Sequence, residues 1–272
     1  MFMGGFLLQK CKLCKERKEL QDSHVIPKLL YRYMRRYQDA TNSLNGLMTL
    51  DSKKQIVDIT QRQWKDKLFC RECEERLSKN ETKFTKILHD INAMERMVLK
   101  TVCYTTDFDE LSEWLRQAQP SINIDEVNQV INQGYFNEEK AETLKYFSAS
   151  YVLRQLYLIK NTLGQKEVDM LESYLLGSRD GDFNLRVKLN YGQPFKAFSS
   201  SLPIDKLIDF KHYNFIVPEM WFHLIFDIND KLGAKKVIIQ PDNFLENKDI
   251  MQLLCSPYQK ATVTKKAKLA LE

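Results

Sequence analysis

Four cysteines in two closely spaced pairs are the residues of this chain best suited to chemistry. Cys11 and Cys14 form one Cys-x-x-Cys pair, and Cys70 and Cys73 form another. Four thiolates at these spacings can close a tetrahedral zinc site, because each pair curls back on itself and two such knuckles complete the coordination shell. The 55 residues between the pairs exceed the roughly 15 to 20 of a zinc ribbon. We therefore predict a zinc ion that staples the ends of a large insert; reduced core thiols or disulfides are the alternative.

A histidine lies within this insert, in the segment Ser23-His24-Val25-Ile26-Pro27. Because the pKa of an imidazole is near neutral, His24 can accept a proton from a water molecule that attacks a substrate. Four cysteines already suffice for zinc, so His24 is not needed as a zinc ligand. A core histidine bonded to the backbone, or an alternative metal ligand, are the other interpretations.

Length, composition and charge narrow the class of protein. With 272 residues, 43% of them hydrophobic, the chain can bury a substantial core. Six cysteines without a cleaved signal sequence predict a reducing compartment, so we expect a cytoplasmic protein. We find no apolar stretch long enough to span a membrane. The first hundred residues carry 21 Lys and Arg against 13 Asp and Glu, a net charge of +8, and the rest carries −3.

This asymmetry favours a polyanionic partner for the cysteine-containing part. Four thiolates with one Zn²⁺ would remove two charges and leave the first hundred residues at about +6, which still suits nucleic acid. The alternative is a surface that is merely soluble.

Secondary-structure signals place the basic residues on one helix. Pro27 favours a helical start, and the pattern predicts a helix through about Tyr37. One side of it carries apolar residues and the other carries basic residues that we predict to contact phosphates, unless they form an ordinary solvated face. These basic residues are Lys28, Arg32, Arg35 and Arg36.

The patterns along the whole chain predict an α+β fold in three regions. These are a zinc-stapled module at 1–90, a helical region at 91–180 and a strand-rich α+β region at 181–272. The patterns predict strands at 55–60, 66–69, 183–189, 213–217, 221–228 and 235–239, and helices at 74 to the nineties, 108–117, 124–133, 137–163 and 165–176. Gly164 and Gly177 are predicted helix stops. We predict that the basic end, with Lys265, Lys266 and Lys268, is a frayed tail.

Segments 23–27 and 68–74 together resemble zinc-containing HNH nucleases of the ββα-metal superfamily, over about residues 6 to 85. In that family two cysteine knuckles hold a structural zinc, a His-hydrophobic-x-Pro segment lies on a hairpin, and a helix begins near the second knuckle. The resemblance implies that His24 is a general base for hydrolysis of a phosphodiester held by a divalent metal. Directly after the fourth cysteine, where the family often has His or Asn, this chain has Glu74, whose carboxylate is a suitable ligand for catalytic Mg²⁺ or Mn²⁺.

The resemblance thus predicts a metal-dependent endonuclease, acting on DNA, of the kind used in bacterial or phage genome conflict and antiviral defence. The sequence departs from the family at Ser23, where an Asp or Glu is usual. That departure supports the rival hypothesis of a non-catalytic zinc module that binds nucleic acid. A third hypothesis is a scaffold that binds a protein partner through residues 91–272.

Overall fold

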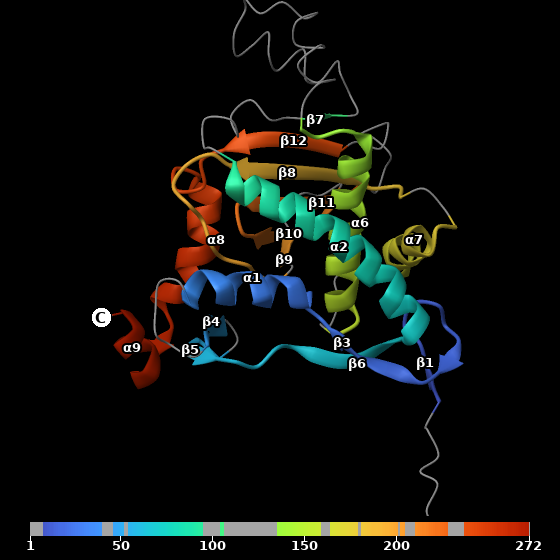
Figure 1. Cartoon of the computed structure of the whole chain (residues 1–272), viewed down its shortest axis with the longest axis horizontal. Helices are drawn as coiled ribbons and strands as arrows, with labels where there is room; N and C mark the ends of the chain where they lie inside the picture. Colours follow the sequence, from blue (N-terminus) through green and yellow to red (C-terminus); the bar gives the residue numbers. More distant parts are fainter. Residues whose placement is uncertain are drawn as a thin grey trace, which may run out of the picture.

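The computed structural model of the chain describes residues 8–39, 46–51, 54–94, 104–105, 135–158, 164–178, 181–200, 202–204, 210–227 and 237–271. These residues form a mixed α+β fold, as predicted (Figure 1). The predicted helices at 108–117 and 124–133, and Cys103, lie outside the described residues.

The N-terminal part is organised by an antiparallel strand pair that leads directly into a long helix. β3 (Leu20–His24) pairs with β6 (Lys65–Cys70), with His24 opposite Lys65. The helix α2 (Arg71–Ala93) starts at the residue after β6. A small hairpin of β1 (Gln9–Lys10) and β2 (Arg17–Lys18) precedes this unit. The segment between β3 and β6 holds α1 (Lys28–Asp39) and a second hairpin, β4 (Leu47–Asp51) with β5 (Ile56–Thr60).

The C-terminal part is dominated by a six-stranded sheet in the order β7-β12-β8-β11-β10-β9. Only the β12–β8 pair is parallel among the strand pairs described in this sheet. Its strands are β7 (Tyr104–Thr105), β8 (Asn184–Asn190), β9 (Leu202–Ile204), β10 (Phe210–Val217), β11 (Met220–Asp227) and β12 (Val237–Asp242). The helices of this part are α6 (Glu138–Leu156), α7 (Gln165–Leu176), α8 (Lys248–Gln259) and α9 (Lys265–Leu271).

Helices α2 and α6 pack together and cover the apolar face of the six-stranded sheet (Figure 1). The ring of Phe84 from α2 stacks on Phe147 from α6 with centroids 3.6 Å apart, and Phe147 also lies against Phe222 of β11. Burying one such side chain stabilises the fold by about 2 to 3 kcal/mol. The largest cluster of buried hydrophobic side chains described contains residues from Cys11 to Ile239, so residues from all three predicted regions share a core. The boundaries at 90 and 180 stay a prediction.

The two predicted glycine stops differ in outcome. Gly177 ends α7 in the left-handed conformation with φ of 77°, as expected of a helix stop. Gly164 instead precedes α7 as its N-cap, and the helix before it is described as far as Leu156.

The prediction of a frayed basic tail is wrong. Residues Thr262–Val263 form β13, which pairs in parallel with β5, and α9 follows it. Ala267 of α9 is fully buried against Val57 and Ile59. The reason is that the β4–β5 hairpin has an edge with unpaired backbone groups and an apolar side, and the tail covers both.

Candidate metal centre and basic cleft

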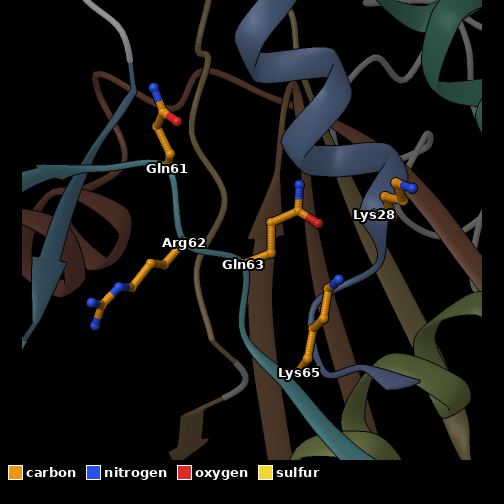
Figure 2. A pocket seen from close by; sticks show the side chains of 5 residues that line it. All are labelled: Lys28, Gln61, Arg62, Gln63 and Lys65. Carbon is orange, nitrogen blue, oxygen red and sulfur yellow. The ribbon is translucent and has the colours of Figure 1, made fainter. Parts of the chain in front are cut away.

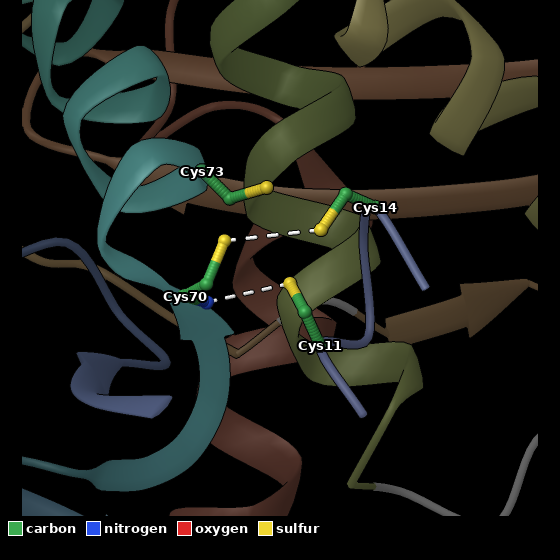
Figure 3. A group of neighbouring side chains, drawn as sticks. All are labelled: Cys11, Cys14, Cys70 and Cys73. Carbon is green, nitrogen blue, oxygen red and sulfur yellow. Dashed lines mark hydrogen bonds between the residues drawn. The ribbon is translucent and has the colours of Figure 1, made fainter. Parts of the chain in front are cut away.

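The four predicted cysteines meet in one cluster at the start of α2 (Figure 3). All four sulfur atoms lie within 4.8 Å of one another, and those of Cys14 and Cys70 are 3.8 Å apart. A zinc ion with Zn–S bonds of about 2.3 Å spaces its ligands about 3.8 Å apart in a tetrahedron. None of the four is in a disulfide. The cluster can therefore hold a metal ion such as zinc, in agreement with the predicted structural site.

Local backbone structure explains why two distant pairs meet. The first pair lies in the turn of the β1–β2 hairpin, where Lys15 takes the left-handed conformation and the backbone N–H of Cys11 donates to Glu16. The N–H of Cys70 donates to the sulfur of Cys11 at 3.3 Å. The second pair lies at the N-terminus of α2, with Cys70 as the N-cap. A hydrogen bond from the Cys73 thiol lowers the pKa of Cys11 to about 4, whereas the same bond raises the pKa of Cys73 and burial raises the pKa of Cys70 to about 11.

His24 lies at the end of β3 and is held by a glutamine. Its Nε2 atom is 2.7 Å from the side-chain oxygen of Gln63. Burial, followed by repulsion from Lys65 and other cations, lowers the pKa of His24 below its ordinary value of 6.5, although the bond to Gln63 acts in the opposite direction. His24 is therefore uncharged at neutral pH and retains a nitrogen able to accept a proton.

A cleft of 560 Å³ lies beside this histidine, lined by Lys28, Gln61, Arg62, Gln63 and Lys65 (Figure 2). Lys28 starts α1 and Lys65 starts β6, whereas Gln61, Arg62 and Gln63 belong to the segment between β5 and β6. The side chains of Gln63 and Lys65 point toward Lys28, and Arg62 points away from them (Figure 2). Three cations and two amides surround the cleft without a carboxylate among its lining residues, so the cleft suits a phosphate group.

Helix α1 is hydrogen-bonded at two positions to the segment that lines this cleft. Arg35 donates to the backbone oxygen of Gln61 at 3.0 Å, and the N–H of Trp64 donates to the hydroxyl of Tyr31 at 3.1 Å. Tyr31 is buried on the apolar side of the helix. Lys28, Arg32 and Arg36 are exposed. The amphipathic helix is thus confirmed, and its predicted phosphate contacts stay a prediction.

Glu74, the predicted ligand of a catalytic metal, faces an arginine. Its carboxylate lies 4.0 Å from the guanidinium of Arg154, which comes from α6 and is only 2% exposed. The same guanidinium lies 2.6 Å from the carboxylate of Glu81. A buried cation thus stands next to both carboxylates. Glu74 as a metal ligand stays a prediction, and this cluster gives catalytic Mg²⁺ or Mn²⁺ no support.

Ser23 has a structural place in the strand pair. It is buried and accepts a hydrogen bond from the N–H of Phe69 at 3.3 Å. Successive side chains on a strand point to opposite faces, so Ser23 faces the core while His24, on the other face, contacts Gln63, which lines the cleft. Within the described residues, the four cysteines form the only cluster of three or more metal-binding side chains.

Two parts of this arrangement were not predicted from the sequence. The segment Gln61-Arg62-Gln63-Trp64-Lys65 is mostly polar and basic, and it approaches His24 only through the pairing of β3 with β6, for which the sequence has no local signal. Arg154 follows the apolar run Tyr151-Val152-Leu153 within a predicted helix, which indicates a buried cation that needs acidic partners.

Comparison with protein-family models, curated proteins and solved structures finds no match to this chain. None of the described helices is both long and apolar enough to cross a membrane. The function must therefore be argued from the cysteine cluster, the cleft and the buried charges.

Proposed function

We propose that this chain is a zinc-stapled protein that binds the phosphate backbone of nucleic acid, DNA in the first instance, in the cleft beside His24. The observation that carries the proposal is the cleft itself, which Lys28, Arg62 and Lys65 line with no acidic side chain among the lining residues. Phosphate contacts from such cations provide most of the affinity of sequence-independent nucleic-acid binding.

The frame around the cleft supports this proposal. The order β3, β6 and α2, with a cysteine pair before β3 and another at the β6–α2 junction, agrees with the strand-strand-helix unit of the ββα-metal resemblance. Zinc would fix the β6–α2 junction against the β1–β2 hairpin. His24 and Lys65 lie opposite each other on β3 and β6 of this unit. The metal would therefore influence the cleft by holding these two strands in position.

A second candidate function is hydrolysis of the bound phosphodiester, and one observation favours it. His24 is uncharged, with its imidazole hydrogen-bonded to a side chain that lines the cleft. Such a group can act as the general base of the predicted endonuclease. Glu74 would then hold Mg²⁺ or Mn²⁺ despite the guanidinium of Arg154 at 4.0 Å. This cation disfavours a second metal, so binding without cleavage is the function we propose first.

Binding is tested by fluorescence anisotropy of a labelled oligothymidylate and a short labelled DNA duplex over a range of salt concentrations. The double variant Lys28→Gln and Lys65→Gln should bind at least about tenfold more weakly at low salt, with a shallower salt dependence. The matched control removes two charges elsewhere, at the exposed Lys79 and Lys86 of α2, by substitution with glutamine. Equal affinity and salt slope in the two variants would exclude the cleft as the binding site.

Hydrolysis is tested separately, with the same DNA probes and a labelled RNA, in Mg²⁺ or Mn²⁺. A nuclease with His24 as its base should lose at least about a hundredfold in rate in His24→Ala, with unchanged zinc content. Glu74→Gln should raise the metal concentration needed for cleavage. Absence of cleavage by the wild type under all these conditions, with binding intact, would leave the non-catalytic function alone.

A further inference from the structure

The last residues of the chain are attached to the hairpin that leads into the cleft. The N–H of Thr262 donates to the backbone oxygen of Gln55 at 2.7 Å, and that of Thr264 donates to Val57 at 3.0 Å. The hydroxyl of Thr264 also donates to Asp58 at 2.9 Å. With Ala267 fully buried below, these contacts fix the start of α9 along β5, although more than 190 residues separate the two segments.

This attachment places lysines next to the segment that lines the cleft. Between residues 260 and 271 the chain has four lysines and no acidic residue. The ammonium group of Lys266 lies 3.3 Å from the backbone oxygen of Ile59. Arg62, which lines the cleft, is three residues further along, a span of at most about 10 Å in extended chain. Arg62 also points away from Lys28 and Lys65 (Figure 2), so its charge is not confined to their side.

Asp58, the acidic residue of β5, does not cancel the positive charge of the lysines on α9. Asp58 accepts the hydrogen bond from Thr264, and this bond, followed by smaller effects that include Lys266, lowers its pKa. Asp58 is therefore ionised at neutral pH, with its carboxylate bonded to Thr264 and attracted by Lys266. Lys265 and Lys268 are exposed and remain as two further positive charges on α9.

We propose that α9 is part of the nucleic-acid surface, with Lys265 and Lys268 contacting phosphates of a strand that runs from the cleft past Arg62. The inference rests on the proposed function and extends it to the far end of the chain. Its basis is the attachment of α9 to β5, because Arg62 and Lys65, which follow β5 in the chain, line the cleft. A polyanion that occupies the cleft and continues along β5 would meet these lysines next.

The test compares three double variants by anisotropy with the labelled oligothymidylate across salt concentrations. Lys265→Gln with Lys268→Gln should reduce the magnitude of the logarithmic salt slope by about 1.4, the loss expected for two contacts with single-stranded phosphates. The cleft variant, Lys28→Gln with Lys65→Gln, should reduce it similarly. The control, Lys79→Gln with Lys86→Gln, has the same net charge as both and should keep the wild-type slope. Circular dichroism and zinc content verify that each variant is folded.

The outcomes separate this inference from the proposed function. If the cleft variant loses slope while the α9 variant matches the control, the inference is overturned and the proposed function stands. If neither variant differs from the control, or the wild type does not bind, the proposed function fails and the inference with it. Loss of slope in both variants, but not in the control, supports both.

Hydrogen exchange gives a second readout that needs no substitution. The amides of Thr262 and Thr264 are protected only while β13 is paired with β5. If nucleic acid binds α9 in its attached position, adding the oligothymidylate should slow exchange of these two amides, because a ligand that binds the closed form stabilises it. Unchanged or faster exchange with saturating oligonucleotide would contradict the proposal.

Discussion

Two groups of positive charge lie near the N-terminal strands and helix α2, and they differ in what surrounds them. Beside His24, Lys28 and Lys65 line a cleft with no carboxylate among its residues. On the side of α2, Arg154 is 2% exposed and lies against Glu74 and Glu81. The positive charge of the first group is available to a ligand, whereas the positive charge of Arg154 is neutralised by two acidic residues of the same chain. A cation is evidence for a binding site only when its counter-charge is absent.

The difference has an energetic reason. An arginine withdrawn from water loses a large solvation energy, which only nearby carboxylates can offset. Arg154 therefore stabilises the contact between α6 and α2 and contributes to the fold. The lysines of the cleft keep their hydration, cost little when unoccupied, and gain an interaction only when an anion enters.

The largest expected effect comes from a substitution that disrupts both the cleft and the Arg154 cluster. Both depend on β6 and α2, which meet at Cys70. We expect Cys70→Ser to lose the metal and unfold roughly the first 85 residues, since the binding free energy of a structural zinc, about 10 to 16 kcal/mol, is largely folding free energy. The zinc content measured by elemental analysis should fall from about one zinc per chain to none. Cys255→Ser, at a cysteine outside the cluster, is the control and should keep its zinc. Unchanged melting and metal content in Cys70→Ser would refute the site.

The next largest effect distinguishes the buried charge from exposed ones. Arg154→Met should destabilise the protein by roughly 3 to 5 kcal/mol, because it leaves two partly buried carboxylates without their cation. The control is Arg71→Met, which breaks the exposed pair of Arg71 with Glu75 on α2 and should cost far less, because solvent screens that pair. Both values are measured by urea unfolding. If the two substitutions cost the same, Arg154 is not the structural cation that its burial indicates.

These two regions also show how far sequence reasoning reached. The helices α1 and α2 were predictable because their apolar residues recur at helical spacing, and the cysteine cluster because the spacing within each pair is a local pattern. The ion pair of Arg154 with Glu81 was not, because it joins residues 73 positions apart and depends on how α6 packs. The cleft was missed for the same reason. His24 meets Gln63 only through the pairing of β3 with β6, which no local pattern specifies.

The C-terminal segment shows a different failure. Lysines and small residues near a chain end are typical of a frayed tail, and Val263, Leu269 and Leu271 are the apolar side chains larger than alanine in the sequence of 261–271. What orders the segment is the exposed edge of β5, which lies about 200 residues away in the sequence. A partner strand elsewhere in the chain can thus order a segment whose own composition favours disorder.

A smaller effect concerns the pH dependence of binding in the cleft. The folded pKa of His24 lies below 6.5, so the imidazole is uncharged at neutral pH and gains a positive charge as the pH falls through the folded pKa. Affinity for the labelled oligothymidylate should rise across that interval, and the salt slope should increase in magnitude by at most about one contact. His24→Gln should lose this pH-dependent gain. A variant that keeps the full gain would show that His24 does not face the bound phosphate.

The smallest effect tests which cause keeps His24 uncharged. Burial is the main cause of its lowered pKa, and repulsion from Lys65, which lies opposite it on β6, is a lesser one. Lys65→Gln should therefore raise the pKa of His24 but leave it below 6.5, as measured by NMR titration of the imidazole. The control Lys79→Gln removes the same charge from α2 and should leave the titration of His24 unchanged. Because an anion in the cleft acts against the same repulsion, adding oligonucleotide to the wild type should also raise this pKa. A pKa that responds to neither change would mean that the charges lining the cleft do not act on His24. The histidine would then have a structural role, like that of Arg154, and no role in binding.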